Sequence, residues 1–396
     1  GGGATDLNGL SDCLVDTDSL YVGEIPGSLS GNPQGNTVLG IDAGIALTSG
    51  ANNTLIGNDA GKALTTAASN VIIGKNAGLA KTSGSNATII GTSAARSTAS
   101  GNMVVLIGSE AGISNTGDNA IAIGSESGRV NTAAATVSIG HNSGYSNTSG
   151  AESTNIGYQA GYSNTTGGEN VNVGYTAGKF QTQGGNVFVG RRSGLGVSGS
   201  STGYNNTGIG QSALWTVTSG NGNTGVGQSA GAGISTGYNN TAIGNNALAS
   251  ANTNIGCVVI GNGANASTTT VVNEVTISSQ SGAARFAGAA TAWTFVSDKR
   301  DKKDIEDLEL GLDFINKLKP RKFKWDIRGT EIDKNKEASG FIAQEVQETL
   351  EEAGADYTGI VDKNNLEQFT LAQANIVPML VKAIQELKAE IELLKQ

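Results

Sequence analysis

A serine and a lysine five residues apart are the side chains of this sequence best placed for covalent chemistry. Ser297 stands where a Gly-, Asn-, Thr- and Ala-rich sequence gives way to a charged one, and Lys302 follows it. A serine hydroxyl becomes a nucleophile when a nearby base removes its proton. The sole histidine, His141, lies in a distant repeated segment, so a lysine is the available base. The pair indicates a place where the chain is cut.

Charge divides the sequence at the same position. Residues 1–296 contain 13 acidic and 9 basic side chains, whereas residues 297–396 contain 21 and 16. The net charge of −9 argues against binding to nucleic acid or to an anionic membrane, because both require clustered Lys and Arg. The short basic run at 321–324 indicates the solvated edge of a strand. No apolar stretch reaches the roughly 18–20 residues of a membrane helix, so no membrane insertion is expected.

Metal or cofactor chemistry has no support in the sequence. Cys13 and Cys257 are the only cysteines and lie in different kinds of segment, which does not indicate a disulfide framework. No metal-ligand spacing occurs. Asp42 and Asp59 have no counterparts in later repeats, which argues against a calcium-binding roll. We therefore expect no metal and no cofactor.

An internal repeat of about 17 residues occupies residues 36–261. One glycine recurs fourteen times, and twelve of the thirteen intervals are 16 or 17 residues long, the other being 20. The residue before this glycine is always Leu, Ile or Val, and the third residue after it is always Ala or Ser. The glycines are Gly40, Gly57, Gly74, Gly91, Gly108, Gly124, Gly140, Gly157, Gly174, Gly190, Gly210, Gly227, Gly244 and Gly261.

The repeat predicts a mainly β fold, a parallel β-solenoid or β-roll shaft of about 14 coils. Thr54 and Ile56 share one face of a strand, and we expect Ile56 and its equivalents to point inward as a ladder. Glycine supplies a bend, and the Ala or Ser marks crowding between coils. At about 4.8 Å per coil the shaft is roughly 65 Å long. Such a thin core favours a trimer.

Different patterns flank the repeat. Residues 1–35 are predicted to be a linker, and residues 262–297 a β-rich shaft tip with a strand at 270–277. Residues 298–396 are predicted to form a small α+β domain. Its expected elements are a helix at 305–318, a strand after Pro320, a helix ending near Glu352, and a continuous helix over 371–396 that contains Pro378. A coiled-coil seam is expected at Leu380, Ile384, Leu387, Ile391 and Leu394.

The motifs of the last hundred residues resemble the C-terminal intramolecular chaperone domain of phage tail spikes and tail fibres of the endosialidase type. Three elements occur in the order of that family. The matching residues are Ser297, Asp298, Arg300, Lys302 and Ile305 in the first, Leu318, Pro320, Phe323 and Trp325 in the second, and Gly340 to Val346 in the third. The shaft repeat is similar to the head repeats of trimeric autotransporter adhesins, with a longer period.

The resemblance implies a domain that trimerises, directs winding of the fibre and then cuts itself off as a single-turnover serine autoprotease. The scissile bond would join Ser297 to Asp298, with Lys302 as the base. Asp301 stands where the family has Leu, and a carboxylate there opposes loss of the Lys302 proton.

Three further residues are implied to support the cut. They are Arg300, in the first matching element, and Gln344 and Glu345, in the third.

The function expected is that of a phage tail fibre. Its partners would be two further copies of the chain in a homotrimer, a host cell-surface receptor, and other tail proteins at the N-terminal side. It would be located in the virion after assembly in the host cytoplasm. The seam, with Ile at a and Leu at d, favours dimers by peptide rules, but the shaft and the resemblance favour three chains.

Two other functions are compared with that of a tail fibre by what each requires of the sequence. The alternative is a cellular trimeric surface adhesin with a non-cleaving trimerisation domain. A glycan-degrading spike would need paired carboxylates, and residues 1–296 carry only 13 acids.

Overall fold

The computed structural model describes residues 13–16, 18–23, 26–27, 29–30, 33–250, 253–279, 282–287, 294–295, 299, 302–324, 337–362 and 369–395. The chain divides into two compact units, Gly1–Val296 and Ser297–Gln396. None of the helices in the described residues is long and apolar enough to cross a membrane.

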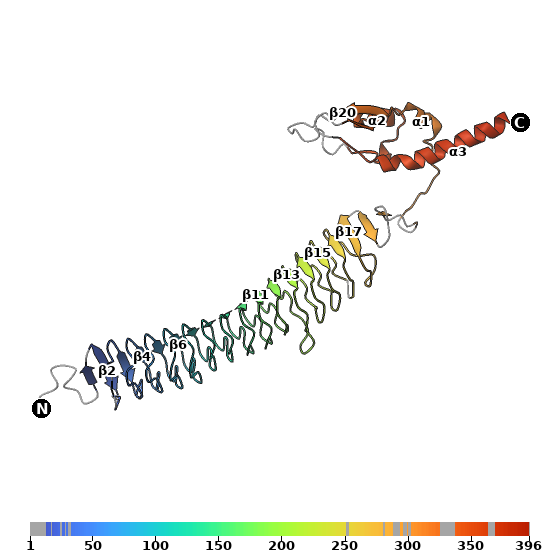
Figure 1. Cartoon of the computed structure of the whole chain (residues 1–396). Helices are drawn as coiled ribbons and strands as arrows, with labels where there is room; N and C mark the ends of the chain where they lie inside the picture. Colours follow the sequence, from blue (N-terminus) through green and yellow to red (C-terminus); the bar gives the residue numbers. More distant parts are fainter. Residues whose placement is uncertain are drawn as a thin grey trace, which may run out of the picture. The chain divides into compact units, whose positions relative to one another are not determined.

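The first unit is a β-solenoid of about fifteen turns, which confirms the predicted fold class (Figure 1). Its strands are β1 (Cys13–Asp16), β2 (Ser19–Gly23), β3 (Thr37–Gly40), β4 (Thr54–Ile56), β5 (Val71–Ile73), β6 (Thr88–Ile90), β7 (Val105–Ile107), β8 (Ile121–Ile123), β9 (Val137–Ile139), β10 (Thr154–Ile156), β11 (Val171–Val173), β12 (Val187–Val189), β13 (Thr207–Ile209), β14 (Thr224–Val226), β15 (Thr241–Ile243), β16 (Val258–Ile260), β17 (Glu274–Ser279), β18 (Gly282–Ala287) and β19 (Thr294–Phe295).

Parallel pairing runs from β2 to β17 in the register of the repeat. Thr54 pairs with Val71 and Ile56 with Ile73, so equivalent residues of neighbouring coils stack. At the N-terminal end β1 and β2 form an antiparallel hairpin, and β2 pairs with β3, so the sheet begins inside the predicted linker. At the other end β17, β18 and β19 pair antiparallel. The predicted strand at 270–277 overlaps β17, which begins at Glu274.

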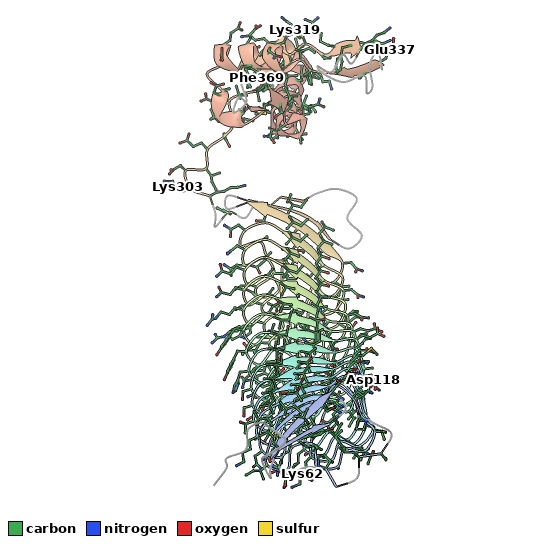
Figure 2. The ribbon with its side chains drawn as sticks, turned by 90° about the vertical axis from the view of Figure 1, so that its left-hand side faces the viewer. Lys62, Asp118, Lys303, Lys319, Glu337 and Phe369 are labelled. Carbon is green, nitrogen blue, oxygen red and sulfur yellow. The ribbon has the colours of Figure 1, made fainter. Side chains whose placement is uncertain are left out.

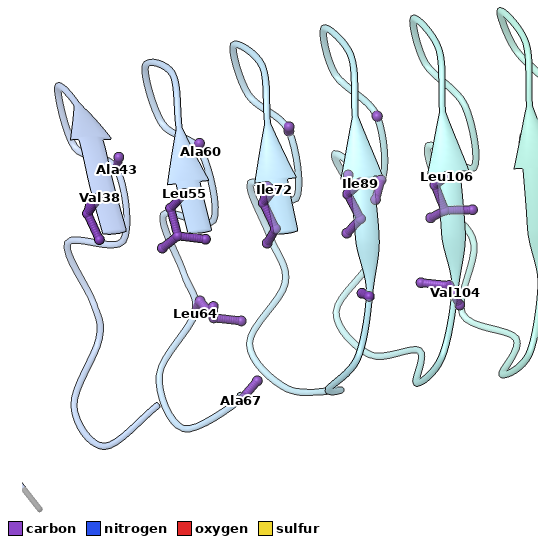
Figure 3. Close-up of a cluster of buried hydrophobic side chains, with 14 of the residues drawn as sticks. Val38, Ala43, Leu55, Ala60, Leu64, Ala67, Ile72, Ile89, Val104 and Leu106 are labelled. Atoms are coloured by element: carbon purple, nitrogen blue, oxygen red, sulfur yellow. The ribbon is translucent and has the colours of Figure 1, made fainter. Parts of the chain in front are cut away.

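The inward face of the strands is opposite to the one predicted. Thr54 and Ile56 do share a face, but it is the outer one, and the middle residue, Leu55, is fully buried. In Figure 3, Leu55 and its equivalents Ile72 and Ile89 form the inner ladder. A period of two fixes which residues share a face without saying which face is buried.

Glycine and the small residue behave as predicted. Gly57 has φ of +127°, and a Cβ there would lie 2.8 Å from the carbonyl carbon of Gly74. Only glycine combines that conformation with so close a backbone approach. The small residue, represented by Ala60, is fully buried against the inner ladder.

The outer face of the sheet carries a continuous row of aliphatic and threonine side chains, here named the outer stripe. It consists of the residue before each repeat glycine and the residue two positions earlier, for example Ile56 and Thr54. Its exposure is high at several coils: 48% at Leu39, 42% at Ile209 and 40% at Ile243.

The interior of the solenoid changes along its length. One aliphatic cluster extends from Tyr21 to Ala122, and a second from Ala177 to Ala264. Between them the inward strand residues are Ser138, Asn155 and Asn172. Amides and hydroxyls therefore replace hydrocarbon in the middle coils.

The second unit is a small α+β domain. Its elements are α1 (Leu312–Lys317), β20 (Arg321–Lys324), β21 (Glu337–Gly340), α2 (Ala343–Glu352), η3 (Asp356–Thr358), β22 (Val361–Asp362), β23 (Thr370–Leu371), η4 (Gln373–Ile376) and α3 (Val377–Leu394). β20 pairs antiparallel with β21, and β22 with β23. Its core joins Phe314 of α1, Val346 and Leu350 of α2, and Met379 of α3.

The predicted strand after Pro320 and the helix ending near Glu352 are confirmed as β20 and α2. The helix predicted at 305–318 is wrong at its start: Ile305 is exposed, and only 312–317 are helical. Leu308 and Leu310 contact the core from an extended segment, where alternate residues share a face.

The predicted continuous helix over 371–396 is also wrong. α3 begins at Val377 with Pro378 in its first turn, where the missing N–H costs nothing.

Candidate functional site

The predicted cleavage segment is described only in part. Ser297, Asp298 and Arg300 are outside the described residues. Lys302 is described: it is exposed, and its backbone N–H donates to the carbonyl oxygen of Lys299 at 3.2 Å. Residues 302–307 are all exposed, and Figure 2 labels Lys303 within this segment.

Glu345 and Gln344 lie in the first turn of α2. Glu345 accepts two hydrogen bonds from Arg321 of β20, from Nε at 2.9 Å and Nη2 at 2.6 Å. This pairing lowers the pKa of the Glu345 carboxyl and raises the pKa of Arg321. Gln344 is exposed beside it.

The Arg321–Glu345 contact holds the β20–β21 hairpin to the start of the Gly340–Val346 motif. The carboxylate uses both oxygens on one guanidinium, which is the geometry of a strong bidentate pair. Glu345 therefore links the start of α2 to β20, and a carboxylate held ionised in this way is a poor proton acceptor.

The basic run at 321–324 was predicted to be a solvated strand edge, and two of its cations have specific partners. Beside Arg321, Lys322 lies 2.8 Å from Glu337, which is labelled in Figure 2. Both acids are contributed by distant positions in the sequence, so the local pattern gave no signal of these pairs.

Glu386 of α3 is a structural residue that the sequence did not reveal. Its Oε2 accepts a hydrogen bond of 2.7 Å from the backbone N–H of Leu312, at the start of α1. A Cβ at Gly311 would clash with this carboxylate. The contact joins α1 to α3 and satisfies a helix-terminal donor.

The predicted seam of α3 is exposed in the single chain. Met379 and Ala383 contact the core, whereas Ile384 is 65% exposed and Ile391 50% exposed. The full exposed row is Leu380, Ile384, Leu387, Ile391 and Leu394. Such an apolar row is typical of an interaction surface.

No metal site accompanies these features: among the residues that the structure describes, no group of His, Cys, Asp or Glu could hold a metal ion. Cys13 and Cys257 are both buried and free.

These features define a class of protein, a β-solenoid shaft followed by a small α+β domain whose last helix exposes an apolar seam. Residues 297–355 match the family described as chaperone of endosialidase. The match supports a C-terminal intramolecular chaperone, and together with the solenoid it fits a tail spike or tail fibre. Searches of curated proteins and of solved structures found no match.

Proposed function

We propose that this protein is a phage tail fibre whose C-terminal domain assembles the shaft and is then released by autoproteolysis between Ser297 and Asp298. One observation carries the proposal: the chaperone match begins at the residue where the second compact unit begins. A cut there would separate two units that each have their own core.

The cut is a hydrolysis. Water is added across the peptide bond, leaving a carboxylate on Ser297 and an amine on Asp298. Lys302, in its neutral form, takes the hydroxyl proton of Ser297, and the serine oxygen bonds to the scissile carbonyl carbon. The C–N bond then breaks, the proton on Lys302 passes to the leaving Asp298 amine, and water hydrolyses the resulting ester.

Two apolar surfaces support a homotrimer. The outer stripe runs along the shaft and is partly exposed at most coils, and the α3 seam, in the second unit, is exposed in the single chain. Association would bury them, which is the main favourable term in forming obligate oligomers. The receptor contact on the host surface and the attachment of other tail proteins to the N-terminal side belong to the same proposal, as do residence in the virion and assembly in the host cytoplasm.

A removable assembly domain suits this shaft. Pairing of parallel strands is non-local, slow, and exposes strand edges before it is complete. A domain that brings three chains together early reduces that exposure. After its removal, a shaft that unfolds has no domain to bring its chains back into the correct strand register.

The test is expression of the full chain and of Ser297→Ala and Lys302→Ala, with Lys317→Ala as a matched control. We expect the wild type and Lys317→Ala to give fragments of 297 and 99 residues by intact mass. Ser297→Ala should stay whole, and Lys302→Ala should be cut slowly or not at all. A wild-type chain that folds and stays whole would rule out self-cleavage and leave the chaperone role standing.

A further inference from the structure

Five aromatic rings gather on successive coils and form two columns. The first column is the residue directly after the repeat glycine; there His141 and Tyr158 stack with centroids 5.5 Å apart, and Tyr158 and Tyr175 at 5.1 Å. The second ring column, here named the third column because a polar column described below is named the middle one, is five residues after the glycine. There Tyr145 and Tyr162 stack with centroids 4.9 Å apart. The rings thus repeat along the sheet at about the spacing of its strands.

Cations cover both ends of the third column and the C-terminal end of the first. Arg191 lies over Tyr175 at 6.0 Å from the ring centroid, Arg129 over Tyr145 at 5.3 Å, and Lys179 at the far end of the third column. The faces of the four tyrosine rings are therefore occupied, and their edges and hydroxyls are left for a ligand. Rings held in this way lose little rotamer freedom on binding.

A polar middle column, two residues after the glycine, lies between the ring columns. The backbone N–H of Gln159 donates to the carbonyl oxygen of His141 at 3.0 Å, which joins it to the first column. The third column also contacts it, since Arg129 Nη2 lies 3.7 Å from Glu110 of the preceding coil.

Three buried polar atoms of this surface have no hydrogen-bond partner among the described residues: Arg129 Nε, Asn142 Oδ1 and Thr176 Oγ1. Thr176 is only 6% exposed. Leaving such an atom unpaired costs about 1–3 kcal/mol, so each one calls for an explanation such as a ligand or bound water.

The interior beneath this surface departs from the rest of the shaft. The coils with stacked rings outside are those with Ser138, Asn155 and Asn172 inside, between the two aliphatic clusters. These coils differ from the rest of the repeat in two ways: polar side chains replace aliphatic ones inside, and aromatic rings are exposed outside. Such departures are expected at functional sites.

Charge gives the surface a sign. In the three columns between positions 124 and 195 the cations outnumber the acids, since Arg129, Lys179, Arg191 and Arg192 are accompanied by one acid, Glu126. Arg192 continues the middle column at its C-terminal end. An anionic group would meet two adjacent guanidiniums there.

We propose that the two ring columns and the middle column, on the coils between 124 and 195, bind a linear polysaccharide carrying acidic groups. The inference rests on the proposed role in host attachment and names the chemistry of the receptor. Tyrosine hydroxyls and the middle-column amides hydrogen-bond to sugar hydroxyls, while Arg191 and Arg192 hold a carboxylate.

A saccharide suits this surface better than a protein partner does. The same groups recur once per coil along one axis, which matches a polymer of repeating units. The surface also lacks the central apolar anchor around which protein interfaces are organised, because its ring faces are already covered.

Binding of the full chain to immobilised alginate oligomers, which carry uronate groups, tests the proposal, with dextran oligomers as the neutral comparison. We expect alginate to bind more tightly than dextran. Tyr158→Ala with Tyr162→Ala should weaken alginate binding at least about tenfold, the loss typical of removing aromatic anchors. Arg191→Gln with Arg192→Gln should remove the preference for alginate.

Two controls separate binding from folding. Tyr204→Ala with Tyr238→Ala removes two exposed tyrosines outside the columns and should leave the affinity unchanged. Tyr158→Phe with Tyr162→Phe keeps the stacks, and a weakened affinity there assigns a role to the hydroxyls.

The proposal is overturned if alginate does not bind, if the ring variants bind as the wild type does, or if the surface binds a host protein that alginate does not displace. Cleavage at Ser297 and chain mass report on the proposed function independently. A cleaved, trimeric protein that does not bind alginate would contradict only the proposed saccharide site.

Discussion

At the scale of single residues, one buried lysine shows how the repeat tolerates a substitution. In an ordinary coil Leu47 fills the core while Asn53 donates to a loop carbonyl oxygen. Two coils further along the chain, the corresponding residues are Lys81 and Ala87. Alanine cannot donate, and Lys81 Nζ instead donates to the carbonyl oxygen of Gly101 at 2.9 Å. Lys81 therefore does the work of both Leu47 and Asn53: its side chain fills the core and its ammonium group donates to the loop carbonyl oxygen.

This arrangement predicts an alkaline stabilisation. Burial lowers the pKa of Lys81 from 10.5 to about 8. The unfolded chain therefore binds more protons between those values, and the free energy of unfolding rises as pH increases from about 8 to 10.5. Below pH 8 the free energy of unfolding carries the full cost of burying the charged lysine, on the order of 3 kcal/mol. Thermal unfolding of the shaft from pH 7 to 10.5 measures it.

Restoring the ordinary pair should remove that dependence. Lys81→Leu with Ala87→Asn should raise the unfolding midpoint at pH 7 and flatten its rise with pH. Lys81→Leu alone should gain less, because the Gly101 carbonyl oxygen loses its donor. A double variant with the wild-type pH profile would show that Lys81 is not the titrating group.

At the scale of elements, the polar middle coils form their own ladder. Asn172 Nδ2 donates to Asn155 Oδ1 at 2.9 Å, and Asn172 Oδ1 has no partner among the described residues. The ladder is thus only partly satisfied, which makes it weaker than the aliphatic ladder on either side.

A paired substitution should reveal this weakness. Asn155→Leu alone should destabilise the shaft by about 1–3 kcal/mol, because Asn172 loses its acceptor. Asn155→Leu with Asn172→Leu should be neutral or stabilising, because both polar partners leave together. Chemical denaturation followed by circular dichroism gives the two values. A double variant that is less stable than the single one would contradict this account.

The same scale shows what could be predicted from the sequence. The repeat predicted coils, their register and the buried position of Ala60, because each follows from a spacing of 16 or 17. It could not predict that Leu55 rather than Ile56 points inward, since both are aliphatic and the choice is made by packing across the coil. In the second unit, Glu386 contacts Leu312 across 74 positions, which no local pattern encodes.

At the scale of the whole molecule, the α3 seam makes a prediction about assembly. In the uncut Ser297→Ala chain, Ile391→Glu should place a charge in the seam and reduce the mass measured by light scattering from about three times 39.9 kDa to 39.9 kDa. Leu393→Glu is the matched control, since Leu393 is 69% exposed and lies off the seam. If both variants keep the trimer mass of the uncut chain, the seam does not hold the chains together.

The last prediction concerns the order of assembly and release. If the C-terminal domain registers three chains before the parallel sheets form, the cut shaft should be unable to repeat that step. The uncut Ser297→Ala trimer and the purified cut shaft are both unfolded in guanidinium and diluted into buffer. We expect the uncut chain to regain its trimer mass and the cut shaft to remain monomeric or aggregate, because strand edges are then exposed without a registering partner. Equal recovery of both would show that the outer stripe alone directs assembly, and that the second unit acts only as an added contact.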